Sequence, residues 1–347
     1  MNILGIMSGT SLDGLDLAVC SFEQKAGFWS YKILYSETVR YDENWIRKLS
    51  AAPHLSGRDL QLLDKEYGQF IAEQALSAIG SAGIKTELIA SHGHTVFHQP
   101  EASFTYQLGN PQAIAAETGI RTVGDFRQKD ILLGGQGAPL VPVGDEMLFG
   151  EYDYCLNLGG FANISYKLDG KRLARDVSPA NIILNQFALE LDLPFDKGGK
   201  AGQSGTISKP LLEELNRIAY YSKPGPASLS REWLESEFLP CIYPYKIPVT
   251  DILRTLYEHI SFQISRQIKP RSKVLLTGGG AYNKFLADTL AYHSQSDIQT
   301  PSPELIEFKE AMVFAFLGLL RIREEINCYA SVTGATRDSS CGVIYLP

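Results

Sequence analysis

The chain has 347 residues, 44% of them hydrophobic and 20% charged, with a formal net charge of −7. A chain of this length exceeds what one hydrophobic core usually covers, so we expect two domains. The acidic balance disfavours a nucleic-acid or anionic-membrane surface and favours a small-molecule partner.

The cysteines and the apolar runs predict a cytoplasmic protein. The five cysteines lie far apart with no C-x-x-C pair, which is typical of reduced thiols rather than a disulfide or zinc framework. The first residues lack the basic region of a signal peptide. The longest apolar stretch, residues 311–320, is half of the roughly 20 residues that a bilayer crossing needs.

The first half of the chain shows alternating strand and helix patterns. Runs at 2–7, 15–22 and 32–39 predict an antiparallel meander, so the first glycine-rich turn lies in a hairpin. A helix is expected from after Ser56 to Gly83, and a strand at 88–91 follows. Asn110 and Pro111 predict the capped start of a helix that ends at Gly119, and residues 121–124 predict the next strand. This order indicates an α/β fold.

The second half is expected to begin with a functional crossover loop between lobes at residues 125–144. The second lobe then opens near Tyr152. Isoleucine and leucine four residues apart predict an amphipathic helix at 250–268. Residues 310–325 are apolar nearly all round and predict a buried helix, whereas residues 342–346 predict a final strand that returns to the first lobe.

Three times, a short apolar run ends in a glycine cluster mixed with hydroxyl or amide residues. The segments are ILGIMSGTSLDGLD at 3–16, YCLNLGGFANIS at 154–165 and VLLTGGGAYN at 274–283. Glycines let backbone N–H groups approach a phosphate closely, so the three turns together predict a nucleotide held between two lobes. The chain has no G-x-x-x-x-G-K-[ST] motif, and its glycines do not fit G-x-G-x-x-G between a strand and a helix, which disfavours P-loop and Rossmann sites.

The first turn also carries two carboxylates. Backbone amides and hydroxyls of residues 8–16 are suited to hold phosphates, and Asp13 or Asp16 is placed to reach Mg²⁺ directly or through water. A tight turn with local Asp hydrogen bonds is the alternative interpretation.

Two further carboxylates are candidate catalytic groups. Asp176 precedes Ser178 and Pro179, a predicted cap for a helix at 180–191, and a carboxylate beside a helix N-terminus suits a general base. The alternative is an acidic residue that stabilises the helix end. Glu310 is predicted to begin the last long helix, where capping is its default role.

Residues 92–98, HGHTVFH, resemble a metal triad, but Gly93 favours close backbone approach and polar contacts to a ligand instead. In the GDFRQKD segment, Asp125 and Arg127 are candidates to clamp an anionic group. A solvated charge run is the alternative interpretation of that segment.

In this order, the motifs MSGTSLDGLD, SHGHTVFHQP, VGDFRQKDILLGGQGAPLVP, NLGGFANIS, LLTGGGAYN and SVTGAT resemble the anhydro-N-acetylmuramic acid kinase family over essentially the whole chain. The resemblance implies a two-lobed α/β fold, similar to actin-like ATPases and ribonuclease H, with a central nucleotide cleft. We expect an N-terminal lobe of residues 1–125 and 331–347, a C-terminal lobe of residues 126–330, and a homodimer.

The resemblance also implies an activity. The family's reaction uses ATP and Mg²⁺: water opens the ring of 1,6-anhydro-N-acetylmuramic acid, and O6 takes the γ-phosphoryl group to give N-acetylmuramic acid 6-phosphate. By this resemblance Asp176 is the base for the attacking water and Glu310 supports it. The amino sugar is expected to contact His92, Asp125, Arg127 and Asn181. The expected ATP-binding residues are Gly9, Thr10, Ser11, Leu12, Asp13, Gly14, Leu15, Asp16, Gly159, Gly160, Gly278, Gly279 and Gly280.

The chain departs from the family pattern at three places in the second lobe. The usual D-T-G-P-G-N reads D-V-S-P-A-N at residues 176–181, and the segments 230–233 and 307–309 also differ. Two alternatives therefore stay open: a kinase for another sugar without ring opening, and a non-catalytic sensor of nucleotide or muropeptide sugar.

Overall fold

The computed structural model describes residues 1–9, 12–223, 225 and 227–347. The chain divides into two compact units, Met1–Leu148 with Phe308–Pro347, and Phe149–Glu307. These limits differ from the expected lobes, because residues 126–148 and 308–330 belong to the first unit. Residues 308–330 belong to the first unit because the last long helix packs on the first sheet.

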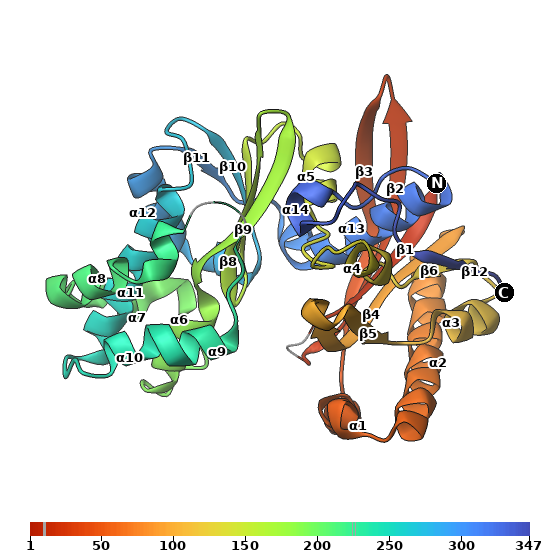
Figure 1. The fold of residues 1–347 in the computed structure, drawn as a ribbon, viewed down its shortest axis with the longest axis horizontal. Helices are drawn as coiled ribbons and strands as arrows, with labels where there is room; N and C mark the ends of the chain where they lie inside the picture. The colour runs from red at the N-terminus through yellow and green to blue at the C-terminus, as the bar shows by residue number, and fades with distance from the viewer. Residues whose placement is uncertain (10–11, 224, 226) are drawn as a thin grey trace. The chain divides into compact units, whose positions relative to one another are not determined.

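In the described residues, seven strands form the sheet of the first unit, in the order β12-β6-β4-β1-β2-β3 with β5 beside β4 (Figure 1). The β1, β2 and β3 strands are antiparallel, whereas β4 is parallel to β1 and to β6. The strands are β1 Asn2–Ser8, β2 Gly14–Lys25, β3 Phe28–Arg40, β4 Leu88–Gln99, β5 Phe104–Leu108, β6 Thr122–Gly124 and β12 Val343–Tyr345. The helices are α1 Glu43–Ala51, α2 Gly57–Ala82, α3 Pro111–Thr118, α4 Gln128–Leu132, α5 Pro142–Leu148, α14 Ala330–Thr333 and the part of α13 Pro303–Ile322 from Phe308 on.

Helices cover both faces of this sheet. Successive side chains of β1 point to opposite faces, so each face presents apolar groups that a helix can bury. On one face, Leu4 and Ile6 join the apolar core that includes Tyr67 and Ile71 of α2. On the other face, Gly5 lies directly under α13: a Cβ at this position would be 1.9 Å from the Ala311 carbonyl oxygen. This close approach fixes α13 to the first sheet.

The second unit repeats the same strand order. Its sheet runs β11-β10-β7-β8-β9, with β7, β8 and β9 antiparallel and with β10 parallel to both β7 and β11 (Figure 1). Its strands are β7 Tyr154–Leu158, β8 Phe161–Leu168, β9 Lys171–Pro179, β10 Lys273–Thr277 and β11 Asp297–Gln299. Its main helices are α6 Asn181–Leu189, α7 Lys200–Ser204, α8 Lys209–Asn216, α9 Arg231–Trp233, α10 Leu239–Ile242, α11 Val249–Ser265 and α12 Lys284–Ser294.

The repeated order is the ribonuclease H-like arrangement that the family resemblance implied: an antiparallel three-stranded meander extended by two parallel strands. In both units, a glycine turn joins the first two strands of the meander. The α/β prediction is confirmed.

Several element predictions are also confirmed. The Ser56 side chain caps α2 by accepting from the Asp59 amide, and Gly83 ends the helix in the left-handed region. The Asn110 side chain caps α3 in the same way. The C-terminal strand β12 pairs with β6.

The interpretation of residues 125–144 as a crossover loop between lobes is wrong. The segment contains α4 and the start of α5, and it lies within the first unit. The Asp130 carboxylate orders its glycines by accepting from the Gly137 amide and from the Thr333 hydroxyl, each at 2.8 Å.

Within the described ranges, no helix has both the length and the apolarity that a membrane span requires.

Buried histidines predict a loss of stability in mild acid. Burial lowers the pKa of His94 to about 4 and that of His259 to about 3, and it lowers the pKa of His92 well below the ordinary 6.5. The fold favours the neutral form of each ring, so their contribution is complete above pH 6.5 and is lost as pH falls toward the folded-state values. Each group then adds a slope of about 1.4 kcal/mol per pH unit.

We therefore expect His259→Gln to reduce the pH dependence of the unfolding free energy by about 1.4 kcal/mol per unit between pH 6 and 5. The measurement is urea denaturation at several pH values. His54→Gln, at an exposed position, is the matched control and should keep the wild-type slope. An unchanged slope in the His259 variant contradicts the assignment.

Candidate functional site

The second glycine turn caps the helix that follows β9. The carbonyl oxygen of Gly160 accepts from the Ala180 amide at 2.8 Å and from the Ile182 amide at 3.2 Å, and that of Gly159 accepts from the Asn181 amide at 3.1 Å. The β7–β8 turn and the first residues of α6 therefore form one structure.

The third glycine turn lies against the same structure. It follows β10, and a Cβ on Gly278 would be 2.5 Å from the Asn157 side-chain oxygen. A Cβ on Gly280 would be 3.1 Å from the Asn181 side-chain oxygen. Asn181 is itself held by donating to the Leu158 carbonyl at 2.9 Å. The structure thus brings together two of the three predicted glycine turns within one unit, with Asn181 between them.

These glycines fall into two groups. Gly278 has φ +79° and no room for a side chain, so the fold itself requires glycine there. Gly160 and Gly279 are different, because a Cβ on either would meet nothing closer than 3.7 Å and neither has a positive φ. Neither packing nor backbone conformation requires glycine at those two positions. Glycine at these two positions is instead consistent with a ligand that approaches the backbone closely.

Asp176 lies in β9, where backbone and side chain are both anchored. Its amide donates to the Ala227 carbonyl at 2.8 Å, its carbonyl accepts from the Tyr220 hydroxyl at 2.7 Å, and its carboxylate accepts from the Leu229 amide at 2.9 Å. Desolvation raises the pKa of the Asp176 carboxyl above its usual value, and the Leu229 hydrogen bond and the Arg175 charge oppose that shift. A fixed carboxylate with a raised pKa suits a general base.

The prediction that Ser178 and Pro179 cap the helix after Asp176 is wrong. The β9 strand continues to Pro179, and α6 begins at Asn181 with Ala180 as an N-cap that makes no side-chain bond. The Ser178 hydroxyl donates to the Pro179 carbonyl instead of capping the helix. The pairing of β9 with β8 places Asp176 opposite Asn163. This pairing keeps Ser178 and Pro179 in the strand, although their local sequence favours the start of a helix.

In the first unit, buried hydroxyl groups support the start of the first glycine turn. The Ser8 hydroxyl, at the end of β1, lies 2.8 Å from the Tyr41 hydroxyl and 3.0 Å from His94 Nδ1. Tyr41 in turn bonds the Tyr67 hydroxyl. Sequence reasoning did not identify this network, because serine, tyrosine and histidine from four separate segments leave no local pattern.

The ligand residues predicted in this turn are partly described. Thr10 and Ser11 lie outside the described residues. The Leu12 amide donates to the Gly9 carbonyl at 3.5 Å, and Leu12 has φ +59°. Gly14 and Leu15 are buried at the start of β2, which pairs with β1.

The two carboxylates of the turn offer hard oxygen donors. Asp13 is exposed, and the Asp16 Oδ1 atom accepts from the Thr38 hydroxyl at 2.6 Å. Among the residues that the structure describes, no group of three or more His, Cys, Asp or Glu side chains is placed to bind a metal ion. Mg²⁺ commonly uses one or two carboxylates together with water and phosphate oxygens, so this pair fits that ion without a full protein cage.

A second cluster of the first unit joins His92 and Arg127. The His92 Nδ1–H group donates to the Gly93 carbonyl at 2.8 Å, which leaves Nε2 to accept from Arg127 Nε at 2.8 Å. Burial and the Arg127 charge lower the pKa of His92, so the ring stays neutral and accepts this bond. The guanidinium also donates to the Gly137 carbonyl at 2.6 Å. His92 therefore holds Arg127, rather than acting as an independent ligand of an anion.

Glu310 interacts electrostatically with this cluster. Desolvation raises the pKa of the Glu310 carboxyl while the charges of Arg127 and Lys309 oppose the shift, and burial lowers the pKa of Arg127 to about 10 although Glu310 favours its charged form. The Glu310 side chain itself keeps solvent exposure. A carboxylate beside a fixed guanidinium can receive or orient a polar substrate group.

The prediction that Glu310 begins its helix is wrong. Helix α13 begins at Pro303, about two turns earlier, so the helix N-terminus does not explain this carboxylate. Its electrostatic partners are Arg127 and Lys309. Asp125 lies elsewhere, with its carboxylate accepting from the Tyr345 hydroxyl of β12 at 2.5 Å.

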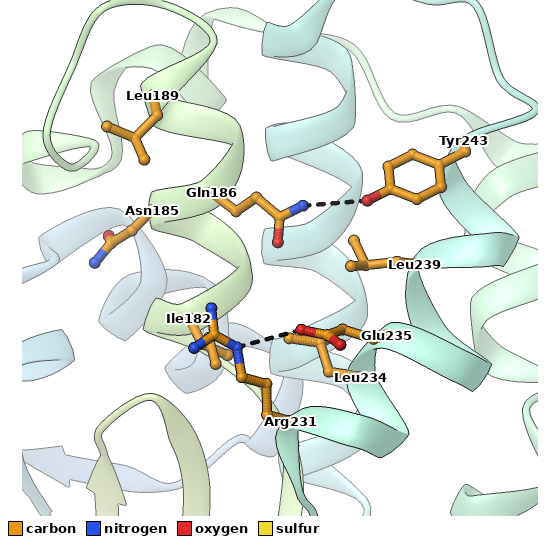
Figure 2. A pocket seen from close by; sticks show the side chains of 9 residues that line it. All are labelled: Ile182, Asn185, Gln186, Leu189, Arg231, Leu234, Glu235, Leu239 and Tyr243. Atoms are coloured by element: carbon orange, nitrogen blue, oxygen red, sulfur yellow. Dashed lines mark hydrogen bonds and ion pairs between the residues drawn. The ribbon is translucent and has the colours of Figure 1, made fainter. Parts of the chain in front are cut away.

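A surface hollow of about 630 Å³ lies in the second unit between α6 and the segment that contains α9 and α10, with Arg231 in α9 and Tyr243 just after α10 (Figure 2). Four of its polar side chains bond in pairs: Gln186 donates to the Tyr243 hydroxyl at 3.4 Å, and Arg231 pairs with Glu235 at 3.3 Å (Figure 2). Opposite charges that neutralise each other give this hollow no preference for an ion. Within each unit, the glycine turns and the carboxylates are the stronger candidates for ligand binding.

Known proteins resemble this chain over nearly its whole length. Residues 1–347 match the model of the family described as anhydro-N-acetylmuramic acid kinase. Curated relatives with that name include one from Vibrio cholerae serotype O1, 33% identical over 99% of this chain and 98% of the relative, and one from Aliivibrio fischeri, 36% identical over the same shares. Among solved structures, component A of (R)-2-hydroxyglutaryl-CoA dehydratase from Acidaminococcus fermentans matches with 14% identity and a TM-score of 0.48, covering 92% of this chain and 97% of that one.

The bond between His92 and Arg127 predicts a difference between two variants. His92→Phe keeps a ring beside Phe314, whose centroid is 4.6 Å away, but removes the acceptor for Arg127 Nε. We expect it to lower the unfolding free energy by about 1–3 kcal/mol, because a partly buried donor loses its partner. His92→Gln, which keeps an acceptor, should lose less. Urea denaturation at pH 7.5 measures both, and equal losses contradict the assigned bond.

Proposed function

The chain belongs to the anhydro-N-acetylmuramic acid kinase family and is therefore a sugar kinase, and from this premise we propose that it opens 1,6-anhydro-N-acetylmuramic acid with water and phosphorylates O6 from ATP. The observation that carries the proposal is Asp176, an anchored carboxylate with a raised pKa in the unit that also contains two glycine turns, each with one open position, Gly160 or Gly279.

In the proposed reaction, Asp176 takes a proton from water as the water oxygen bonds to C1 of the sugar. The C1–O6 bond breaks, O6 bonds to the γ-phosphorus of ATP, and ADP leaves. The products are ADP and N-acetylmuramic acid 6-phosphate. Such a phosphoryl transfer needs mainly positioning and charge stabilisation, whereas ring opening needs one well-placed base.

The remaining predicted residues take binding roles in this proposal. Phosphates of ATP approach the backbone at Gly160 and Gly279, where a Cβ would have room. When bound through Asp13 and Asp16, Mg²⁺ supplies positive charge that offsets the phosphate charges. Arg127, held by His92, orients the sugar together with Glu310. We further propose a cytoplasmic homodimer, as the family resemblance implies.

The central test combines ATP, Mg²⁺ and the anhydro sugar with purified protein. We expect a product heavier than the substrate by one phosphoryl group (HPO₃) and one water, detected by mass spectrometry. Asp176→Asn should lower kcat by about 10²–10⁴-fold, the usual contribution of a general base. Asp169→Asn, in the exposed β8–β9 turn, is the control and should leave kcat unchanged.

Failure of the wild type to form product, or full activity in Asp176→Asn, contradicts the proposal. A panel of other amino sugars addresses the alternatives that the altered 176–181 segment leaves open. Phosphorylation of another sugar without the added water mass indicates a different kinase. Ligand binding without any turnover indicates a sensor.

The two groups of glycines give a second test. Gly160→Ala should raise the KM for ATP by about tenfold, because the added methyl fills space available to a phosphate, and it should leave Tm near wild type. Gly278→Ala should instead lower the unfolding free energy by about 1–3 kcal/mol, because this position has a positive φ and no space. Steady-state kinetics and thermal melting separate the two effects. Normal ATP kinetics in Gly160→Ala removes that turn from the ATP site.

A further inference from the structure

A buried ion pair lies beside Glu310. Lys309 Nζ of α13 is 2.7 Å from Asp145 Oδ1 of α5, and both side chains are only 6% exposed. A buried ion pair is expensive to desolvate, so its presence calls for a reason beyond stability. Sequence reasoning noted that residues 307–309 depart from the family pattern but assigned Lys309 no role.

The pair acts on one of three faces of α13. Lys309 and Val313, four residues apart, share the face toward α5, where a Cβ on Gly144 would be 2.6 Å from Val313 Cγ2. Ala311 and Ala315 share the face toward β1, under Gly5. These two contacts set the rotation of α13 about its own axis.

That rotation decides where Glu310 points. Glu310 shares the third face with Phe314, four residues on. The Phe314 ring lies 4.6 Å from the His92 ring and 5.5 Å from the Phe126 ring, centroid to centroid. Glu310 is thereby presented on the side of α13 that faces the His92–Arg127 cluster, in agreement with its electrostatic interaction with Arg127.

The pair also lies close to both chain connections between the two units. Asp145 is three residues before the first connection, at Leu148, and Lys309 is two residues after the second, at Glu307. A contact at this place ties together, inside the first unit, the two segments that lead to the second unit.

We propose that Lys309 and Asp145 are positioning residues for Glu310: their ion pair fixes the rotation of α13 that presents the Glu310 carboxylate beside Arg127. The inference deepens the proposed function and rests on it for the catalytic readout. It predicts that removal of either charge misplaces Glu310 even where the protein still folds.

The test compares Lys309→Met, which keeps the length of the side chain, with Asp145→Asn. Each is expected to lower kcat by about tenfold or more through misplacement of Glu310, while the KM for ATP stays within about twofold of wild type. Amide hydrogen exchange over residues 308–312 should become faster in both. Lys284→Met, which breaks the exposed Lys284–Asp288 pair of α12, is the matched control and should change neither readout.

Wild-type kcat and exchange in folded Lys309→Met, even with a lower Tm, would overturn the inference, since the pair would then be purely structural. Loss of activity in Lys309→Met but not in Asp145→Asn would also overturn it, because the lysine charge alone would then matter. If the single variants do not fold, the Asp145→Leu/Lys309→Met double variant decides: slow turnover in the folded protein supports the inference, and wild-type turnover overturns it.

The two proposals fail separately. If the wild type shows no kinase activity, the proposed function is wrong, and hydrogen exchange alone decides the role of the ion pair. Faster exchange at residues 308–312 in both single variants then supports it, and unchanged exchange overturns it.

Discussion

The contact between Gly5 and α13 determines the geometry of the first unit. The Ala311 carbonyl oxygen occupies the space that a Cβ on Gly5 would need, and Gly318 contacts Ala90 of β4 in a similar way. No larger residue at position 5 leaves the helix at this distance from the sheet. Because α13 lies directly on β1 and β4, Phe314 reaches His92, and Glu310 interacts electrostatically with Arg127.

The second unit has the same order of five strands and also places a glycine-rich turn between the first two strands of its meander. Its β7–β8 turn corresponds to the β1–β2 turn of the first unit, and both turns are rich in glycine. In the second unit the helix after the meander is capped by the turn itself, through the carbonyl oxygens of Gly159 and Gly160. These contacts fix the backbone of the turn, whereas the Asp176 carboxylate of β9 is held separately, by the Leu229 amide. A repeated topology gives two glycine turns with different carboxylates beside them.

Much of this fold could be predicted from local signals. The caps of α2 and α3 are local, because Ser56, Gly83 and Asn110 each bond within four residues of the helix end that they define. A short stretch of sequence is therefore enough to locate these helix ends. The same reasoning failed at Ser178 and Pro179, where pairing between β8 and β9 outweighs a good capping sequence.

The candidate site was less predictable because its key contacts are long-range. Ser178 shows that even a local motif can mislead, and no local motif links Asp130 to Thr333 or Lys309 to Asp145. Gly160 and Gly278 also look alike in sequence, and only their surroundings separate a position with open space from one that packing requires. The sequence identified the candidate site residues, but it did not identify the distant residues that contact them in the fold.

The central claim is that water, activated by Asp176, opens the sugar ring in the same reaction that phosphorylates O6. The most direct measurement is a single turnover in ¹⁸O-labelled water, with rapid borohydride reduction to prevent exchange at C1, followed by fragment mass spectrometry. The account predicts one ¹⁸O atom on C1 and none in the phosphoryl group. An unlabelled C1, or label in the phosphoryl group, would contradict it.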